Sequence, residues 1–229
     1  MRWAVVVVVL AGCRIGFDDA GGPLTVGDGG GSNNAPDAGQ ITTIPVDAAP
    51  GTLIPTLVAD SYLMGTDNSP NGAEVFVNCG RNSGNGANMW GVWRFDLTSL
   101  PQQAVSNATL RLYQYSSVGT TTIAYEIYRI TQTWDEASVD WTHASTGVTW
   151  PGGGAISTNT YATANVVLGT NGYYDWDVTT LANEWLTGAQ PNDGLLMAYV
   201  SQPPPGSYAF FASNNHATAA WHAQLLITP

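Results

Sequence analysis

From about residue 56 to the C-terminus, short apolar runs alternate with clusters of Gly, Asn, Ser and Pro, and this texture restricts the fold most strongly. In the segment 108–113 every second residue is apolar. Ala108, Leu110 and Leu112 are therefore expected on one face, with the residues between them on the other. A period of two is that of a β-strand with one buried face. The pattern predicts a sheet whose inner face is covered.

Further runs of this kind predict more strands, separated by turn residues. The short intervals between them leave little room for helical crossovers, which favours antiparallel pairing in an all-β sandwich, or jelly roll. The expected strands are Ala59–Met64, Val75–Asn78, Trp90–Leu97, Ala108–Tyr115, Ile123–Ile130, Ala162–Leu168, Tyr173–Asp177, Leu195–Val200, Tyr208–Ser213 and Ala223–Thr228.

One segment has a helical period instead. The apolar residues of 178–186 recur at i, i+3, i+4, i+7 and i+8, which is the pattern of an amphipathic helix. Asp177 is expected to be its N-cap, and Gly188 is expected to end it. The sequence therefore predicts one short helix that closes an end of the core, with Trp185 buried.

The N-terminus predicts an export signal. Arg2 precedes the apolar run Trp3–Leu10, which is too short to span a bilayer but suits a signal peptide. Residues 10–13 (LAGC) resemble a bacterial lipobox, which implies cleavage before Cys13 and attachment of lipid to Cys13. Because Arg14 rather than Asp follows, we expect an exported protein anchored at the outer membrane or cell surface, touching the membrane only through this lipid.

The segment 13–55 that follows the signal peptide of residues 1–12 is rich in Gly, Ala, Asp and Pro, with only scattered apolar residues. Such a composition cannot bury enough apolar surface to offset the entropy lost on ordering. We expect a lipid-anchored disordered linker here, which leaves residues 56–229 as the folded domain. Its prolines are Pro23, Pro36, Pro45, Pro50 and Pro55.

The charge of the chain argues against one class of partner. It carries 17 acidic residues and six Arg, has no Lys, and has a net charge of -11. Because so acidic a chain repels phosphate backbones, nucleic acid is not expected to bind. Of the two cysteines, Cys79 loses its partner if Cys13 carries lipid, and we expect a small buried thiol rather than a disulfide to Cys13.

Four stretches carry a family resemblance. They are 59–62 (ADSY), 93–112 (which contains WRFDLTSLP and ATLRL), 134–141 (WDEASVDW) and 177–196, which opens with DVTTL and ends with GLL. In this order they resemble DNRLRE domains, which are grouped with carbohydrate-binding module family 96. The resemblance implies a jelly-roll sandwich of secreted and surface proteins, often an accessory module beside polysaccharide-active enzymes.

Catalytic patterns are weak. His143, His216 and His222 do not have the spacing of a usual zinc site. Paired carboxylates could hydrolyse or eliminate at sugars, and the candidates are Asp135, Glu136 and Asp140 in one segment and Asp175 and Asp177 on one strand face. The structural interpretation is that Glu136 ties down its own loop through backbone N–H groups. We therefore expect no enzyme and no required cofactor.

Calcium is the one metal that the residues suggest. Asp60, Asp67 and Asn68 supply hard oxygen ligands in a loop-rich region, and structural calcium is typical of jelly-roll binding modules. The three residues do not follow the ordered spacing of an EF-hand. The sequence therefore leaves structural calcium as an open alternative.

Sugar binding requires an exposed aromatic face beside polar side chains. By alternation Tyr113 and Tyr115 share the outward side of their strand with Arg111, and Trp150 lies in a Gly-rich loop. These four residues are the candidate glycan-binding set. The aromatic residues of the family-like motifs, Trp93, Trp134, Trp141 and Trp185, are expected in the core.

The leading hypothesis is a surface-displayed, non-catalytic module that binds a polysaccharide or cell-surface glycan, or acts as an adhesin. A structural envelope protein that binds other proteins is one alternative. A small polysaccharide lyase or hydrolase is another, and it would need a deep acidic cleft that joins Glu136 or Asp140 to an Arg or His.

Overall fold

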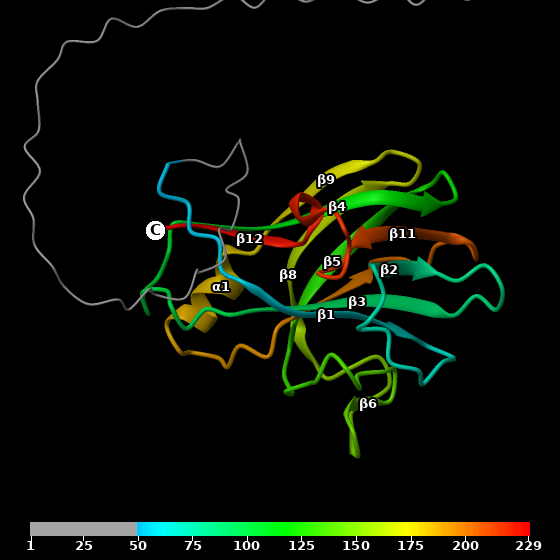
Figure 1. Cartoon of the computed structure of the whole chain (residues 1–229), viewed down its shortest axis with the longest axis horizontal. Coiled ribbons are helices and arrows are strands. Elements are labelled where there is room, and N and C mark those ends of the chain that lie inside the picture. Colours follow the sequence, from blue (N-terminus) through cyan, green and yellow to red (C-terminus); the bar gives the residue numbers. More distant parts are fainter. Residues whose placement is uncertain (1–49) are drawn as a thin grey trace, which may run out of the picture. The chain divides into compact units, whose positions relative to one another are not determined.

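The computed structural model describes residues 50–229, in which strands dominate and one α-helix lies at the end of the sheet (Figure 1). All ten predicted strands are present, some with shifted ends. The strands are β1 (Leu57–Met64), β2 (Phe76–Arg81), β3 (Asn88–Phe95), β4 (Asn107–Val118), β5 (Thr122–Ile130), β6 (His143–Ser145), β7 (Val148–Thr149), β8 (Ile156–Val167), β9 (Gly172–Asp177), β10 (Leu195–Tyr199), β11 (Ser207–Ala212) and β12 (Gln224–Thr228).

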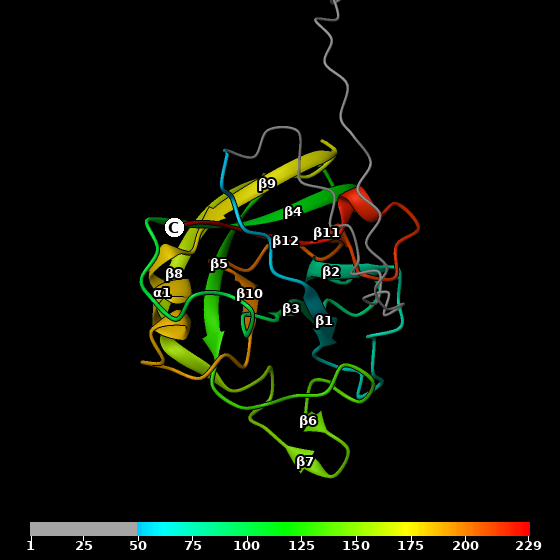
Figure 2. The same cartoon turned by 60° about the vertical axis from the view of Figure 1, so that its left-hand side comes forward.

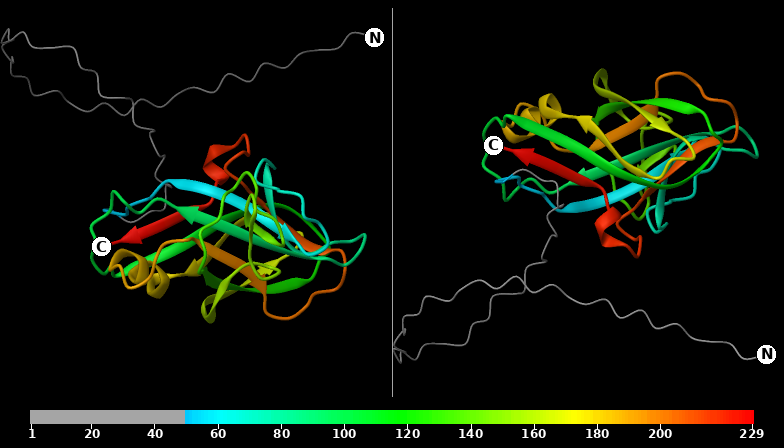
Figure 3. Two further views of the ribbon diagram at one scale, coloured as in Figure 1. Left: turned by 90° about the horizontal axis from the view of Figure 1, so that it is seen from below. Right: turned by 90° about the horizontal axis from the view of Figure 1, so that it is seen from above.

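Ten strands form one antiparallel sheet, and the expected all-β fold is confirmed. The order is β12-β4-β11-β2-β3-β10-β5-β8, with β1 added to β3 and β9 added to β4. Strand β4 is the branch point, because it pairs with β12 along its first half, with β11 along its second half and with β9 over Thr109–Gln114. The sheet curls until it is nearly closed, as the views along its edges show (Figure 3).

The inner core forms as the alternation predicts. Ala108, Leu110 and Leu112 of β4 are fully buried and pack into one large cluster with residues of the facing strands. Strand β10 shows a second arrangement, because Leu195 and Met197 join this inner core while Leu196 and Ala198 belong to a separate one. Part of the sheet is therefore buried on both faces.

This second core is built by the segment between β5 and β8, residues 131–155, which folds back over β1, β3 and β10 (Figure 2). The short pair β6–β7 lies within this segment. Strands β6 and β7 were not predicted from the sequence, because both are very short and Val148 and Thr149 are exposed, so no alternation marks them. The second core consists of Ala59, Leu63, Val92, Ile130, Trp134, Val139, Ala144, Trp150, Leu196 and Ala198.

Helix α1 spans Thr179–Leu186 and buries Trp185 as expected. The predicted N-cap is wrong by one residue, since Val178 holds the N-cap position and makes no side-chain cap hydrogen bond. Asp177 instead accepts hydrogen bonds from the backbone N–H and the hydroxyl of Thr179. Gly188 follows the helix with φ of 72°, the left-handed conformation of a helix end.

The predicted signal peptide, lipid site at Cys13 and most of the linker lie outside the described residues, and these expectations remain predictions. Within residues 50–229, no helix combines the length and the apolar character that crossing a membrane would require. Cys79 is a free thiol with no exposed surface, as expected. Burial also raises the pKa of this thiol, so it is held in the protonated form.

Candidate functional site

The outward side of β4 carries the two predicted tyrosines. Tyr113 and Tyr115 contact a common set of rings on the outside of the sheet, so the predicted shared face is confirmed. Tyr113 is paired with Tyr173 of β9, and the two rings meet edge to face with centroids 4.8 Å apart. On the other side, Phe210 of β11 lies 6.2 Å from Tyr115 between ring centroids.

Trp221 completes this surface, although the sequence analysis gave it no role. It ends the 3-10 turn η1 (Ala219–Trp221), which lies over the outside of the sheet and is drawn in red in Figure 1. Its ring is nearly parallel to that of Tyr115, at 11° and 6.3 Å. His216 also contacts it at 5.0 Å between centroids. We call Tyr113, Tyr115, Tyr173, Phe210, His216 and Trp221 the aromatic face.

Arg111 lies at one end of the aromatic face. Its Nε and Nη2 donate to the two carboxylate oxygens of Asp175, each at 2.9 Å, in the bidentate arrangement typical of arginine and carboxylate. The guanidinium carbon is 5.5 Å from the centroid of the Tyr173 ring. These contacts fix the orientation of the guanidinium group. Arg111 and Asp175 therefore present donors and acceptors in a defined direction beside exposed rings.

The rings of the aromatic face are only partly buried, and Tyr173 is 46% exposed. The hydroxyl of Tyr173 donates to the carbonyl oxygen of Ala220 at 2.7 Å, which ties the η1 turn to β9. A row of fixed rings flanked by polar groups offers the apolar C–H face of a pyranose a surface on which to stack. Of the four predicted residues, Arg111, Tyr113 and Tyr115 lie together here, and whether they bind a glycan stays a prediction.

Trp150 does not lie with these three residues, and this prediction is wrong. Its side chain is 6% exposed and packs in the second core, where the 131–155 segment that carries it covers β1, β3 and β10. Its indole N–H donates to the carbonyl oxygen of Asp140 at 3.1 Å. The Gly-rich loop after Trp150 allows the close approach, since a Cβ at Gly153 would lie 2.4 Å from the ring of Trp90. The glycines serve packing rather than exposure.

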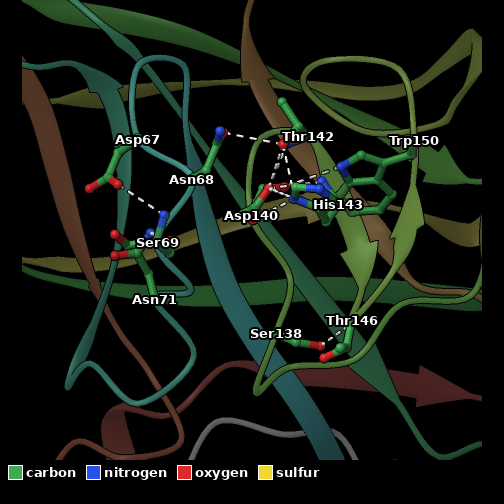
Figure 4. A network of polar contacts seen from close by, with 10 residues as sticks. All are labelled: Asp67, Asn68, Ser69, Asn71, Ser138, Asp140, Thr142, His143, Thr146 and Trp150. Carbon is green, nitrogen blue, oxygen red and sulfur yellow. Dashed lines mark hydrogen bonds and ion pairs between the residues drawn. The ribbon is translucent and has the colours of Figure 1, made fainter.

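Asp140 is the centre of the polar network shown in Figure 4. Its Oδ1 accepts hydrogen bonds from the backbone N–H groups of Thr142 and His143, at 2.7 and 2.8 Å. The His143 ring nitrogen Nδ1 lies 2.9 Å from Oδ2. Burial raises the pKa of Asp140, but these hydrogen bonds outweigh it and hold the pKa below its ordinary value. The carboxylate is occupied in holding its own loop.

Glu136 behaves differently from the prediction. Its Oε1 accepts from the backbone N–H of Asp60 and from the side-chain amide of Asn214, each at 3.1 Å. It therefore joins β1 to the loop after β11 rather than securing its own loop. Sequence reasoning could not find this arrangement because the three residues are 76 to 154 positions apart along the chain.

The predicted calcium set is only partly reflected in the structure. Asp67 accepts a hydrogen bond from the backbone N–H of Ser69, and Asn68 accepts one from the hydroxyl of Thr142. Asp60 lies elsewhere, with Glu136 and Asn214. Among residues 50–229, no three His, Cys, Asp or Glu side chains are grouped closely enough to hold a metal by themselves.

A hollow of about 540 Å³ lies beside helix α1, away from the aromatic face. Arg94 and Asn192 line it, but Arg94 donates to the carbonyl oxygen of Trp134 at 2.9 Å and Asn192 donates to that of Phe95 at 2.8 Å. Both side chains therefore hold the ends of the strands together. The hollow is lined by apolar side chains such as Val58, Leu97 and Trp185 as well as by these two polar residues, whose hydrogen bonds serve the fold.

Together, the nearly closed antiparallel sheet and its outer aromatic row define a β-rich module. Residues 66–227 match the model of the disaggregatase related repeat domain, and the chain belongs to that family. Comparison with curated proteins finds no match. The family match supports an extracellular repeat module, whereas the resemblance to DNRLRE domains stays a prediction.

Proposed function

We propose that this chain is a non-catalytic glycan-binding module, displayed at the cell surface by the lipid anchor predicted at Cys13. The observation that supports the proposal best is the aromatic face, in which Trp221 and Tyr113 stack beside the exposed ring of Tyr173. Rings held in place before binding lose little entropy when a sugar stacks on them. The Arg111–Asp175 pair beside them supplies both donors and acceptors for sugar hydroxyl groups.

The charge distribution favours a neutral glycan. Residues 50–229 contain four Arg and no Lys, and each Arg already has an intramolecular partner. The chain as a whole has a net charge of -11, which repels polyuronates. The partners are Gly86 and Pro203 carbonyls for Arg81, the Trp134 carbonyl for Arg94, Asp175 for Arg111 and Glu184 for Arg129.

Affinity gel electrophoresis of the purified full-length chain tests the proposal. Neutral polysaccharides such as mannan, xylan and β-glucan are compared with alginate and pectate, and retardation by at least one neutral polymer is expected. Trp221→Ala and Tyr173→Ala should each weaken retardation about tenfold, because stacking on an aromatic ring is lost. Tyr128→Ala, an aromatic residue outside the aromatic face, should leave it unchanged. Absence of retardation by every polymer would contradict the proposal.

A second candidate is an envelope protein that binds other proteins through the same surface. The burial of Trp150 favours it, because the set of exposed aromatic side chains is smaller than the sequence suggested. Half-buried tyrosine and tryptophan are also common where proteins meet. Crosslinking on whole cells, followed by comparison of the native chain with Trp221→Ala, distinguishes the two, since only this candidate expects a Trp221-dependent protein adduct that survives digestion of glycans.

A further inference from the structure

Three segments that are far apart in the sequence meet around the side chain of Asp60. Asp60 lies in β1, Glu136 lies in the segment that covers the second core, and Asn214 lies in the loop after β11. The backbone N–H of Asn214 donates to Asp60 Oδ2 at 2.7 Å, and Glu136 Oε1 accepts from both Asp60 and Asn214. The Glu136 carboxylate therefore contacts the backbone of Asp60 and the side-chain amide of Asn214, and the Asp60 carboxylate contacts the backbone of Asn214.

Neighbouring contacts hold these segments close together. Asn215 donates from its amide to the carbonyl oxygen of Gly72 at 2.8 Å, and Ser213 donates to that of Glu74 at 2.7 Å. Gly72 lies so close to Glu136 that a Cβ there would be 2.3 Å from the Glu136 carbonyl oxygen. The oxygen atoms around Asp60 are therefore fixed by the fold rather than carried on free loops.

Two oxygens at this point are buried without a partner. Asp60 is 1% exposed, and its Oδ1 accepts no hydrogen bond. Asn214 Oδ1 is also buried and unpartnered. The orientation of this amide is fixed, because its Nδ2 donates to Glu136 and a flip would place oxygen against a carboxylate. Buried acceptors of this kind are costly unless a ligand or proton satisfies them.

The charge of the two carboxylates is also uncompensated within the described part of the chain. The ion pairs of residues 50–229 involve the carboxylates of Asp175, Glu184 and Asp140, and neither Asp60 nor Glu136 has a cationic partner there. Burial, with a smaller contribution from the Glu136 charge, raises the pKa of Asp60 to about 7. A buried carboxylate next to a second one is unfavourable unless a positive charge lies between them.

We propose that Asp60, Glu136 and Asn214 hold a calcium ion. The donors are all hard oxygens, which suit calcium, and the site offers none of the sulfur or imidazole ligands that zinc prefers. Calcium takes six to eight oxygens with flexible geometry, so water and backbone carbonyl groups complete the shell. The ion joins β1, the cover of the second core and the β11 loop, which also carries His216 of the aromatic face, and so it stabilises the fold.

Isothermal titration of the EDTA-treated full-length chain with calcium chloride tests this site, together with thermal unfolding. One calcium per chain is expected, with a rise in Tm of about 5 to 10 °C at about 100 times the Kd. Asp60→Asn, which keeps the shape but removes a charge, should weaken calcium binding at least about tenfold. Asp135→Asn, the carboxylate beside Glu136 in sequence, is the matched control and should bind as the native chain does.

Calcium titration and thermal unfolding both test the calcium site, and neither measurement depends on whether the chain binds a glycan. If the native chain shows neither heat nor a change in Tm at about 10 mM calcium, which is about ten times the Kd of the weakest extracellular sites, a shared proton rather than a cation satisfies the pair and the proposal is overturned. If Asp60→Asn still binds one calcium with native affinity, the ion lies elsewhere and the proposal also fails. Magnesium should bind more weakly, because it demands near-octahedral geometry.

Discussion

The rings of Tyr113 and Trp221 stack face to face, with centroids 4.5 Å apart and planes within 12° of each other. One ring comes from the central strand β4 and the other from the η1 turn, 108 positions further along the chain. The stack therefore fixes the last loop of the chain against the outside of the sheet. It also decides which ring surfaces remain open, because the covered side of each ring faces the other.

This stack predicts a measurable coupling between the two residues. Tyr113→Ala and Trp221→Ala should each destabilise the protein, and the double variant should lose less than the sum. The expected coupling is about 0.5 to 1.5 kcal/mol, which is typical of aromatic pairs. Denaturant unfolding of the four proteins measures it, and additive losses would show that the rings are neighbours without a favourable interaction.

The second core predicts that its tryptophans contribute as much to the free energy of unfolding as the tryptophans inside the sheet do. Trp134 is 2% exposed, and its indole N–H donates to the carbonyl oxygen of Asp193 at 2.8 Å. Trp134→Ala should therefore cost about 3 to 5 kcal/mol in the free energy of unfolding. Trp141→Ala, in the same segment but half-buried, should cost clearly less. Urea unfolding compares the two, and equal small losses would mean that the 131–155 segment is only loosely attached.

The inner core could be predicted because alternation is a local signal. Ala108, Leu110 and Leu112 are buried in the structure as the period of two required, and the opposite face carries Tyr113 and Tyr115. Burial of one sheet face is decided by the strand's own residues. Ten strands and the helix were therefore within reach of the sequence alone, whereas the short strands β6 and β7 were not.

The remaining site residues depend on contacts between distant segments. Trp150 looked exposed because it is flanked by glycines, but the second core that buries it forms only when 131–155 folds over β10. Trp221 lies in a turn without periodicity, so nothing local assigned it to the aromatic face. Asp60 was selected for its oxygens, whereas its partners Glu136 and Asn214 are brought to it by the fold.

The hydrogen bonds of Asp140 predict a pH-dependent contribution to stability. Its pKa is lowered from the ordinary value of 3.8, so the folded state favours the ionised carboxylate. The stabilisation is therefore complete above that ordinary value and is lost as pH falls through the lowered pKa. Asp140→Asn should cost about 1 to 3 kcal/mol at pH 7.

Urea unfolding of Asp140→Asn and the native chain between pH 7 and pH 2.5 measures this effect. The difference in the free energy of unfolding should shrink toward the acid end, where the native carboxyl group is also neutral. A difference for Asp140→Asn that is constant across the range would mean that the charge of Asp140 does not contribute.

Gly194 immediately precedes β10, and an added Cβ at this position is predicted to destabilise the fold strongly. Its φ is 92°, and a Cβ there would lie 2.4 Å from the carbonyl oxygen of Trp93 in the neighbouring strand. Gly194→Ala should cost about 2 kcal/mol or more, because left-handed strain and a clash with backbone act together. Gly188 has φ of 72° with no atom within 4 Å of the added Cβ, so Gly188→Ala should cost only about 1 kcal/mol. Thermal unfolding of the two variants separates strain from clash, and equal shifts in Tm would show that β10 can move away from Trp93.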